Sequence, residues 1–279
     1  ALLRHPRVGR ALVPGALWEA VIFRYVPDPH CIFQGMQKLP PASLLVAEVG
    51  GGVRRESYWD LSFEEPFGAR PQALAEGLLE ELDEAVRLRL VADVPLGAFL
   101  SGGLDSAAVV SSMRRCREEV LAVSVGFADD SFDERPAARA VAARFGVRLE
   151  EHLTTPDLEA DLPRLAHHFD EPFFDSSALP TLHVCAAARR HVTVALSGDG
   201  GDEALAGYRR YRFDRLENRW RRFLPGPLRR GLLAPLGRAW PRSPGLPRWL
   251  RAGATLENLG RDPFQAYIDS VSALAPAAA

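Results

Sequence analysis

Two short loops carry the residues whose types and spacing could do chemistry, and the first is Ser101–Ser106, with the sequence SGGLDS. It follows an apolar run at 94–100 that is typical of a buried strand, and it precedes a helical pattern. Two adjacent glycines let the backbone approach a ligand, and the unpaired N–H groups of a helix start attract an anion. Asp105 is out of place beside a phosphate unless a divalent cation lies between them. The loop therefore predicts a site for pyrophosphate with Mg²⁺, and it is not a Walker loop because GxxxxGK[ST] is missing.

The second loop is Ser197–Glu203, with the sequence SGDGGDE. It also follows an apolar run, at 192–197, and it opens a predicted helix. Three glycines and three carboxylates within seven residues cost conformational entropy and charge repulsion. A plain turn does not explain that cost, whereas a site that binds a metal ion or transfers a proton does.

The elements that position both loops alternate between strand and helix. The strand patterns are near-continuously apolar, which is typical of a parallel sheet covered on both faces. Ligands of such sheets bind at the carboxyl ends of the strands, where both loops lie. Strands are predicted at 94–100, 120–127, 147–153 and 192–197, and helices from 72 onward, at 107–115, at 134–146 with Gly146 closing it, at 157–169 and at 178–190.

The rest of the chain has a weaker pattern. SLLVAEV (43–49) and VRRESYW (53–59), separated by three glycines, predict a hairpin. From Trp220 onward the sequence is rich in Arg, Pro and Leu and has little helical periodicity, and the final ALAPAAA gives no natural domain end.

Composition excludes several classes of protein. Lys+Arg is 34 and Asp+Glu is 36, so the formal net charge of -2 gives no basic field for nucleic acid and no bias toward a membrane surface. No apolar run approaches the roughly 20 residues of a membrane helix. The three scattered cysteines predict neither a disulfide framework nor a zinc site. We expect a cytoplasmic protein, and a fragment, because the chain starts Ala-Leu-Leu-Arg without Met.

The two loops also carry a resemblance to a known family. SGGLDS resembles the pyrophosphate loop of the N-type ATP pyrophosphatases, and SGDGGDEALAGYRRY resembles the second signature of the asparagine synthetase family. FDERPAARAVAARFG (132–146), FDEPFFDSSALP (169–180) and the early GMQKLPPASLL are similar to that family in the same order. The resemblance implies an α/β fold with a doubly wound parallel sheet of the adenine-nucleotide α-hydrolase (PP-loop) type. It further implies that residues 1–60 are the end of a glutamine amidotransferase domain, 61–71 a linker, and 72–279 the synthetase domain, cut off at its C-terminus.

The resemblance implies a role for individual residues as well. Val125 would face adenine, and Ser197 and Gly198 would close the nucleotide site. Asp105 and Asp202 would bind Mg²⁺, while Asp199 and Glu203 would be the acidic catalytic candidates beside the activated carboxyl group. The backbone that holds ATP would come from Leu100, Ser101, Gly102, Gly103, Leu104, Asp105 and Ser106.

The activity that the resemblance implies is amide formation. A carboxylate, aspartate by default, would react with ATP to give an acyl-adenylate and pyrophosphate, and ammonia derived from glutamine would then attack the adenylate. Two alternatives stay open, an intramolecular cyclase of the β-lactam synthetase type and a nucleotide-binding paralogue without turnover. The resemblance also admits a homodimer, and it implies no nucleic-acid or membrane partner.

Overall fold

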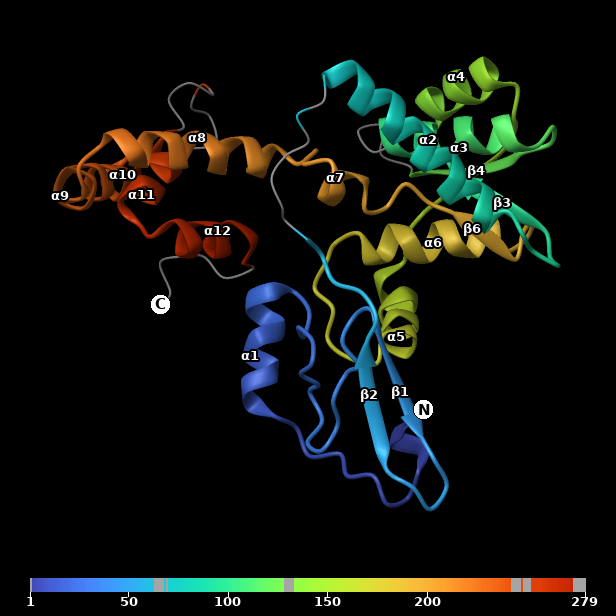
Figure 1. The fold of residues 1–279 in the computed structure, drawn as a ribbon, viewed down its shortest axis with the longest axis horizontal. Helices are drawn as coiled ribbons and strands as arrows, with labels where there is room; N and C mark the ends of the chain where they lie inside the picture. Colours follow the sequence, from blue (N-terminus) through green and yellow to red (C-terminus); the bar gives the residue numbers. More distant parts are fainter. Residues whose placement is uncertain are drawn as a thin grey trace. The chain divides into compact units, whose positions relative to one another are not determined.

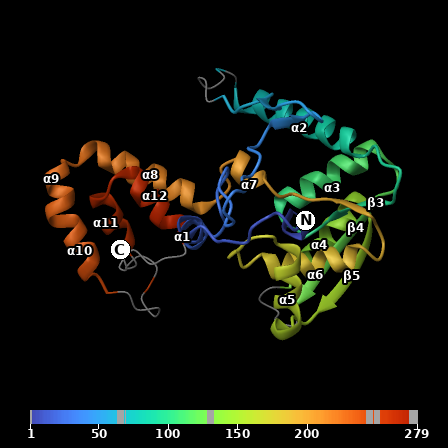
Figure 2. The same cartoon turned by 90° about the horizontal axis from the view of Figure 1, so that it is seen from below.

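The computed structural model describes residues 2–62, 68, 70–127, 133–241, 247 and 252–272. The chain divides into two compact units, Ala1–Val13 with Asp28–Gly201, and Pro14–Pro27 with Asp202–Ala279. Figure 1 labels most of their helices and strands, and Figure 2 labels β5.

The first unit is built on a parallel sheet of four strands in the order β5-β4-β3-β6. All four predicted strands are confirmed, and the predicted α/β class with them. The strands are β3 (Leu96–Phe99), β4 (Leu121–Phe127), β5 (Arg148–Thr154) and β6 (Val194–Leu196). The chain first adds β4 and β5 on one side of β3 and then places β6 on the other. The order therefore reverses between β3 and β6, which is where sheets of this kind form a crevice.

Helices cover both faces of this sheet, as the apolar strands predicted. Ala98, Leu100 and Ala122 point to one face, and Phe99 and Val123 to the other. In Figure 1, α2, α3 and α4 lie above the strands and α6 lies below them. The helices are α2 (Pro71–Arg89), α3 (Leu104–Cys116), α4 (Arg135–Phe145), α5 (Leu158–His168) and α6 (Ala178–Ala188). Figure 2 shows β5 with α5 and α6 beside it.

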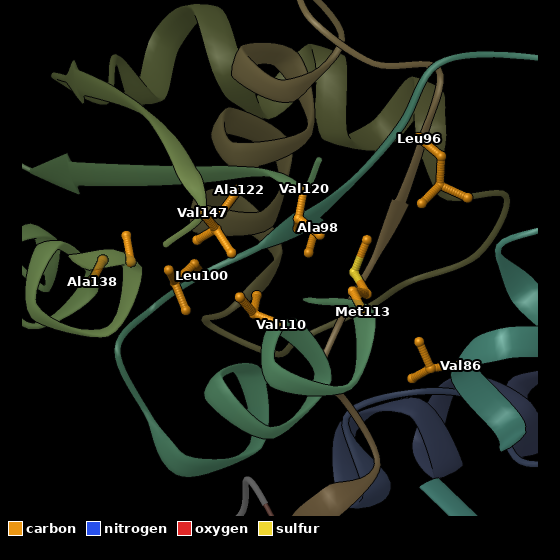
Figure 3. Packing of buried hydrophobic residues seen from close by; sticks show 11 residues of the cluster. Val86, Leu96, Ala98, Leu100, Val110, Met113, Val120, Ala122, Ala138 and Val147 are labelled. Carbon is orange, nitrogen blue, oxygen red and sulfur yellow. The ribbon is translucent and has the colours of Figure 1, made fainter. Parts of the chain in front are cut away.

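The larger core lies between the sheet and α2, α3 and α4. Figure 3 shows Val110 and Met113 of α3 against Ala98 and Leu100 of the sheet region, and all four residues are at most 1% exposed. The small side chains of the strands let the helices pack closely on the sheet, which holds the start of α3 against the end of β3.

Two helix details follow local rules. Gly146 ends α4 in the left-handed conformation with φ of 64°, as its sequence position predicted. The apolar side chains of α2 are buried only in its second half, where Val86 is 4% exposed, whereas Leu74 near the start is 44% exposed.

The N-terminal part of the first unit contains the predicted hairpin. Strands β1 (Ser43–Ala47) and β2 (Val53–Ser57) pair antiparallel, with Ser43 opposite Ser57 and Ala47 opposite Val53. A short 3₁₀ turn at Leu2–Arg4 precedes them. The linker predicted at 61–71 lies in part outside the described residues, and Pro71 already begins α2.

The second unit is helical in its described residues, including the stretch after Trp220 where the sequence pattern was weak. Arg221 is buried there, and it donates hydrogen bonds to Asn218 Oδ1 (2.6 Å) and to the Asn258 carbonyl oxygen (2.7 Å). This buried arginine belongs to the packing of the unit. The elements are α1 (Pro14–Phe23), α7 (Gly201–Ala204), α8 (Arg209–Phe223), α9 (Gly226–Leu228), the π-helical turn η3 (Arg229–Leu233), α10 (Ala234–Ala239), α11 (Gly253–Gly260) and α12 (Pro263–Val271).

Across the part of the chain that the structure describes, we find no helix with both the length and the apolar character needed to cross a membrane.

The core makes a stability prediction. Val110→Ala should lower the free energy of unfolding by about 2 kcal/mol, because it removes buried methyl groups and leaves a cavity behind. The matched control is Val91→Ala, at a site 85% exposed, which should change it by less than about 0.5 kcal/mol. Urea unfolding of both variants measures the difference, and equal effects would contradict the packing described here.

Candidate active site

A cavity of about 340 Å³ lies in the first unit, at the carboxyl ends of β3, β4 and β6. It collects most of the residues that the sequence singled out, from three separate segments of the chain. These residues are Leu100, Ser101, Gly103, Leu104, Asp105, Ser106, Val125, Ser197, Gly198 and Asp199.

The first loop is held in shape by its own hydroxyl groups. The Oγ atoms of Ser101 and Ser106 lie 3.0 Å apart, and the Gly103 N–H donates to Ser101 Oγ at 3.2 Å. Gly102 does not line the cavity but has φ of +83°, and a Cβ there would lie 2.5–2.8 Å from atoms of Ala137 and Ala138. Only glycine fits at that position, so the turn is set by close packing against α4.

The start of α3 faces the same cavity. Gly103 is the N-cap of this 13-residue helix, and no side chain caps it. The N–H groups of a first helical turn have no partner within the helix, and together with the helix dipole they favour an anion. The Ser101 and Ser106 hydroxyl groups lie at this end of the cavity as well, and the Ser106 hydroxyl donates to the Gly103 carbonyl oxygen at 3.2 Å.

The second loop lies against the first through Gly198. A Cβ at this position would lie 2.7 Å from the Ser106 nitrogen and 2.8 Å from the Asp105 carbonyl carbon. Ser197 Oγ donates to Asp199 Oδ2 at 2.7 Å and accepts from the Asp199 N–H at 3.0 Å, which orders the loop. A Cβ at Gly201 would likewise come within 2.7 Å of the Asp105 carboxyl carbon. Glycine at 198 and 201 is therefore what lets the two loops approach each other.

The opposite wall of the cavity is mostly apolar, and sequence reasoning missed most of it. Among its residues, Pro180, Thr181 and Val184 come from α6, at a spacing that puts them on one helix face. That spacing shows that the three share a helix face, but it does not show what the face contacts. The strand side of this wall consists of Phe99, Val123, Ser124, Val125 and Phe127. A cavity with hydroxyl and N–H donors at one end and an apolar wall at the other suits a ligand that has phosphate groups and a flat ring system.

Glu134 is a further lining residue that the sequence did not single out. It stands at the N-cap of α4. Its side chain keeps contact with solvent, yet the surrounding protein raises the pKa of the carboxyl group by desolvation. Glu134 thus lines this cavity together with Asp105 and Asp199.

The remaining two predicted residues, Asp202 and Glu203, belong to the second unit. The Asp202 side chain turns toward Gly207, whose N–H donates to the Asp202 carbonyl oxygen at 2.9 Å. Glu203 Oε1 accepts a hydrogen bond of 2.7 Å from the Tyr208 hydroxyl. This bond lowers the pKa of Glu203, and mainly through it the pKa of Tyr208 rises to about 12. The pairing of Asp105 with Asp202 at a metal ion remains a prediction.

The donor set at the cavity bears on the predicted Mg²⁺. Among the described residues, no group of three or more His, Cys, Asp or Glu side chains could together hold a metal ion. Mg²⁺ prefers oxygen ligands and is commonly held by one or two carboxylates together with phosphate oxygens and water. The Asp105 carboxylate fits that mode, in which a phosphate ligand completes the site.

The comparisons with known proteins concern most of the chain. Residues 77–274 match the family model described as Asparagine synthase. "Asparagine synthetase [glutamine-hydrolyzing] 1" from Bacillus subtilis is 33% identical over 71% of the chain and 31% of its own length. "Putative asparagine synthetase [glutamine-hydrolyzing] 2" from Methanocaldococcus jannaschii is 36% identical over 66% of the chain and 36% of its own length. The chain thus spans about a third of the length of these relatives.

Among solved structures, the NH3-dependent NAD synthetase from Campylobacter jejuni is similar over 48% of this chain and 60% of that chain. The sequence identity is 15% and the TM-score 0.34.

The Tyr208–Glu203 bond predicts a specific pH dependence. Because the pKa of Tyr208 is raised in the folded protein, its contribution to stability is present below the ordinary tyrosine pKa and is lost as the pH rises toward about 12. Glu203→Gln removes the negative charge and should return this pKa toward the ordinary value of about 10.

An absorbance titration of tyrosine ionisation measures the shift, with Tyr208→Phe identifying which component belongs to this residue. Glu84→Gln, which breaks the Glu84–Arg87 pair on α2, is the control and should leave the curve unchanged. Superimposable curves for the wild type and Glu203→Gln would contradict the assignment.

Proposed function

The chain belongs to the asparagine synthase family, and from this premise we propose that it forms the ATP-dependent part of an amide-forming ligase. The protein would adenylate a carboxylate, aspartate by default, and join it to ammonia released from glutamine. Residues 72–279 would bind ATP, and residues 1–60 would belong to the amidotransferase part of the same protein. We place the reaction in the cytoplasm, where ATP is available.

The observation that carries this proposal is the cavity in which both loops meet. One end offers the Ser101 and Ser106 hydroxyls and the start of α3, and these would bind the phosphates of ATP. The apolar wall with Val125 would receive the adenine ring. A ligand that carries both phosphates and a ring system would fill the cavity, and ATP, which the family uses, is such a ligand.

While the adenylate forms, the residues of this chain would hold the metal ion and the pyrophosphate end of ATP. Asp105 would hold Mg²⁺ against the phosphate oxygens, together with Asp202 as the family motif implies. When bound, Mg²⁺ supplies positive charge that neutralises the leaving pyrophosphate. The N–H groups of α3 and the serine hydroxyls would hold the pyrophosphate end in place while the substrate carboxylate attacks the α-phosphorus.

The acidic residues of the second loop would serve the amide-forming half of the reaction. Asp199 lines the cavity, and its carboxylate is oriented by Ser197 Oγ at 2.7 Å. Glu203 is held by Tyr208. As ammonia attacks the acyl carbon, the bond to AMP breaks and AMP leaves. A carboxylate near the adenylate can accept the proton that ammonia loses in this step, and we assign this task to Asp199 and Glu203.

One prediction concerns Asp105. In the full-length protein, Asp105→Asn should lower carboxylate-dependent exchange of pyrophosphate into ATP by about a hundredfold, since it removes charge from the metal site while keeping the side-chain shape. It should also abolish the dependence of ATP binding on Mg²⁺.

The control for Asp105→Asn is Asp93→Asn, at an exposed site outside the cavity, and it should exchange at the wild-type rate. The acceptor is identified by screening aspartate and other carboxylates with the wild-type protein. If no carboxylate supports exchange in the wild type, the proposed reaction is wrong.

A second prediction concerns the contact between the loops. Gly198→Ala should weaken ATP binding by at least about tenfold, because the new methyl group would push the second loop away from the backbone of Asp105 and Ser106. Gly52→Ala is the matched control, since a Cβ there meets nothing within 4 Å. Calorimetric titration with ATP and Mg²⁺ compares the two variants, and equal affinities would show that the close approach of the loops is not needed.

A further inference from the structure

Glu171 joins two parts of the first unit that are far apart in the sequence. Its Oε2 lies 2.5 Å from the Nζ of Lys38, and its Oε1 accepts a hydrogen bond of 2.9 Å from the Ile32 N–H. The Cys31 thiol also interacts with this carboxylate. Lys38 is the only lysine of the chain. Three groups of the segment 31–38 thus contact the Glu171 carboxylate.

The segment on the N-terminal side is itself ordered. The Lys38 N–H donates to the Pro29 carbonyl oxygen at 3.0 Å, which closes the segment into a loop. The Gln34 N–H donates to the Ala11 carbonyl oxygen at 2.8 Å, and Ile32 is 7% exposed. Glu171 therefore binds a folded part of the chain and not a loose strand.

On the other side, Glu171 lies in the connection between α5 and α6, seven residues before α6 begins at Ala178. Helix α6 carries the Pro180, Thr181 and Val184 side chains that line the cavity. A shift of this connection would move the wall of the cavity, because the chain between Glu171 and Pro180 is short.

Helix α6 also contacts α5 and β5 through His183. His183 Nε2 lies 2.7 Å from Asp161 Oδ2 of α5, and His183 Nδ1 lies 3.0 Å from Thr154 Oγ1 of β5. These contacts fix α6 against the sheet (Figure 2). Glu171 adds a tie to the N-terminal segment, at the end of α6 nearest the cavity-lining residues.

The Glu171–Lys38 pair is partly shielded from water. The side chains are 14% and 31% exposed. Burial would by itself raise the pKa of Glu171, but the hydrogen bonds from Lys38 and the Ile32 N–H outweigh it and lower the pKa. The carboxylate is therefore charged at neutral pH, and a shielded charged pair resists separation more than a surface pair does.

We propose that Glu171 is a positioning residue that holds the N-terminal segment and the α6 wall of the cavity in register, so that ammonia from glutamine reaches the adenylate. This inference rests on the proposed function, in which residues 1–60 belong to the ammonia-supplying part. Free ammonia can enter from solvent and depends less on this register. The glutamine-dependent reaction should consequently suffer more than the ammonia-dependent one when the tie is broken.

The test uses the full-length protein with Glu171→Gln, Lys38→Met and the double variant. Glutamine at 171 keeps an oxygen that can accept from the Ile32 N–H, so the variant removes mainly the charge. The matched control is Glu151→Gln, which breaks the 2.9 Å Glu151–Arg139 pair of the same unit. Three rates are measured for each: carboxylate-dependent pyrophosphate exchange, amide formation with ammonia, and amide formation with glutamine.

The expected result is that Glu171→Gln and Lys38→Met lower the ratio of glutamine-dependent to ammonia-dependent amide formation by about tenfold. The double variant should lower it no further, because both residues act through one contact. Glu151→Gln should leave the ratio unchanged. Hydrogen exchange reports directly on the Glu171–Lys38 contact. In both single variants, residues 31–38 and 178–188 should exchange faster than in the wild type.

Other results would overturn the inference. An unchanged ratio with faster hydrogen exchange would make Glu171 a purely structural residue, and unchanged hydrogen exchange would show that the tie does not hold α6. If Glu151→Gln also lowered the ratio of glutamine-dependent to ammonia-dependent amide formation, general destabilisation would explain the effect. Absence of carboxylate-dependent exchange in the wild type would instead refute the proposed function, and the inference would fall with it.

Discussion

The candidate site depends on the parallel pairing of β3 with β6. Leu96 lies opposite Val194 and Ala98 opposite Leu196. Both strands therefore end at the same edge of the sheet, and the loops that follow them lie side by side. The backbones of the two loops then touch at residue 198. Only glycine fits there, because a Cβ would lie 2.7 Å from the Ser106 nitrogen. Two segments about ninety residues apart in the chain become one site because their strands are neighbours in the sheet.

The two ends of the cavity are built by different forces. At the loop end, hydrogen bonds such as Ser101–Ser106 and Ser197–Asp199 order the polar groups. At the other end, α6 forms an apolar wall, and buried polar contacts around it decide its position. His183 fixes α6 to its neighbours, and Glu171 connects the chain before it to the N-terminal segment. Polar contacts of α6 and of the chain before it thus accompany the apolar side chains that α6 presents to the cavity.

The carboxylates of the second loop have different surroundings. Asp199 accepts from a serine hydroxyl two residues earlier, whereas Glu203 accepts from a tyrosine hydroxyl five residues later. The Tyr208 bond lowers the pKa of Glu203, so this carboxylate stays ionised to lower pH than an ordinary glutamate. Asp105, in the first loop, instead lies beside Gly201, where a side chain would collide with its carboxyl group. Acidic residues that look alike in the sequence are therefore distinguished by the groups that contact them.

The sequence by itself determined the strands, the helices around them and the two loops, because apolar runs, glycines and cap residues act over a few neighbouring positions. Gly146 ending α4 and the hairpin at Ser43–Ser57 are examples. It could not determine that Thr181, Val184 and Glu134 line the cavity, or that Glu171 binds Lys38, a residue 133 positions earlier in the chain. Such contacts arise only when the strand order and helix packing bring distant segments together, and no local pattern of residues encodes them.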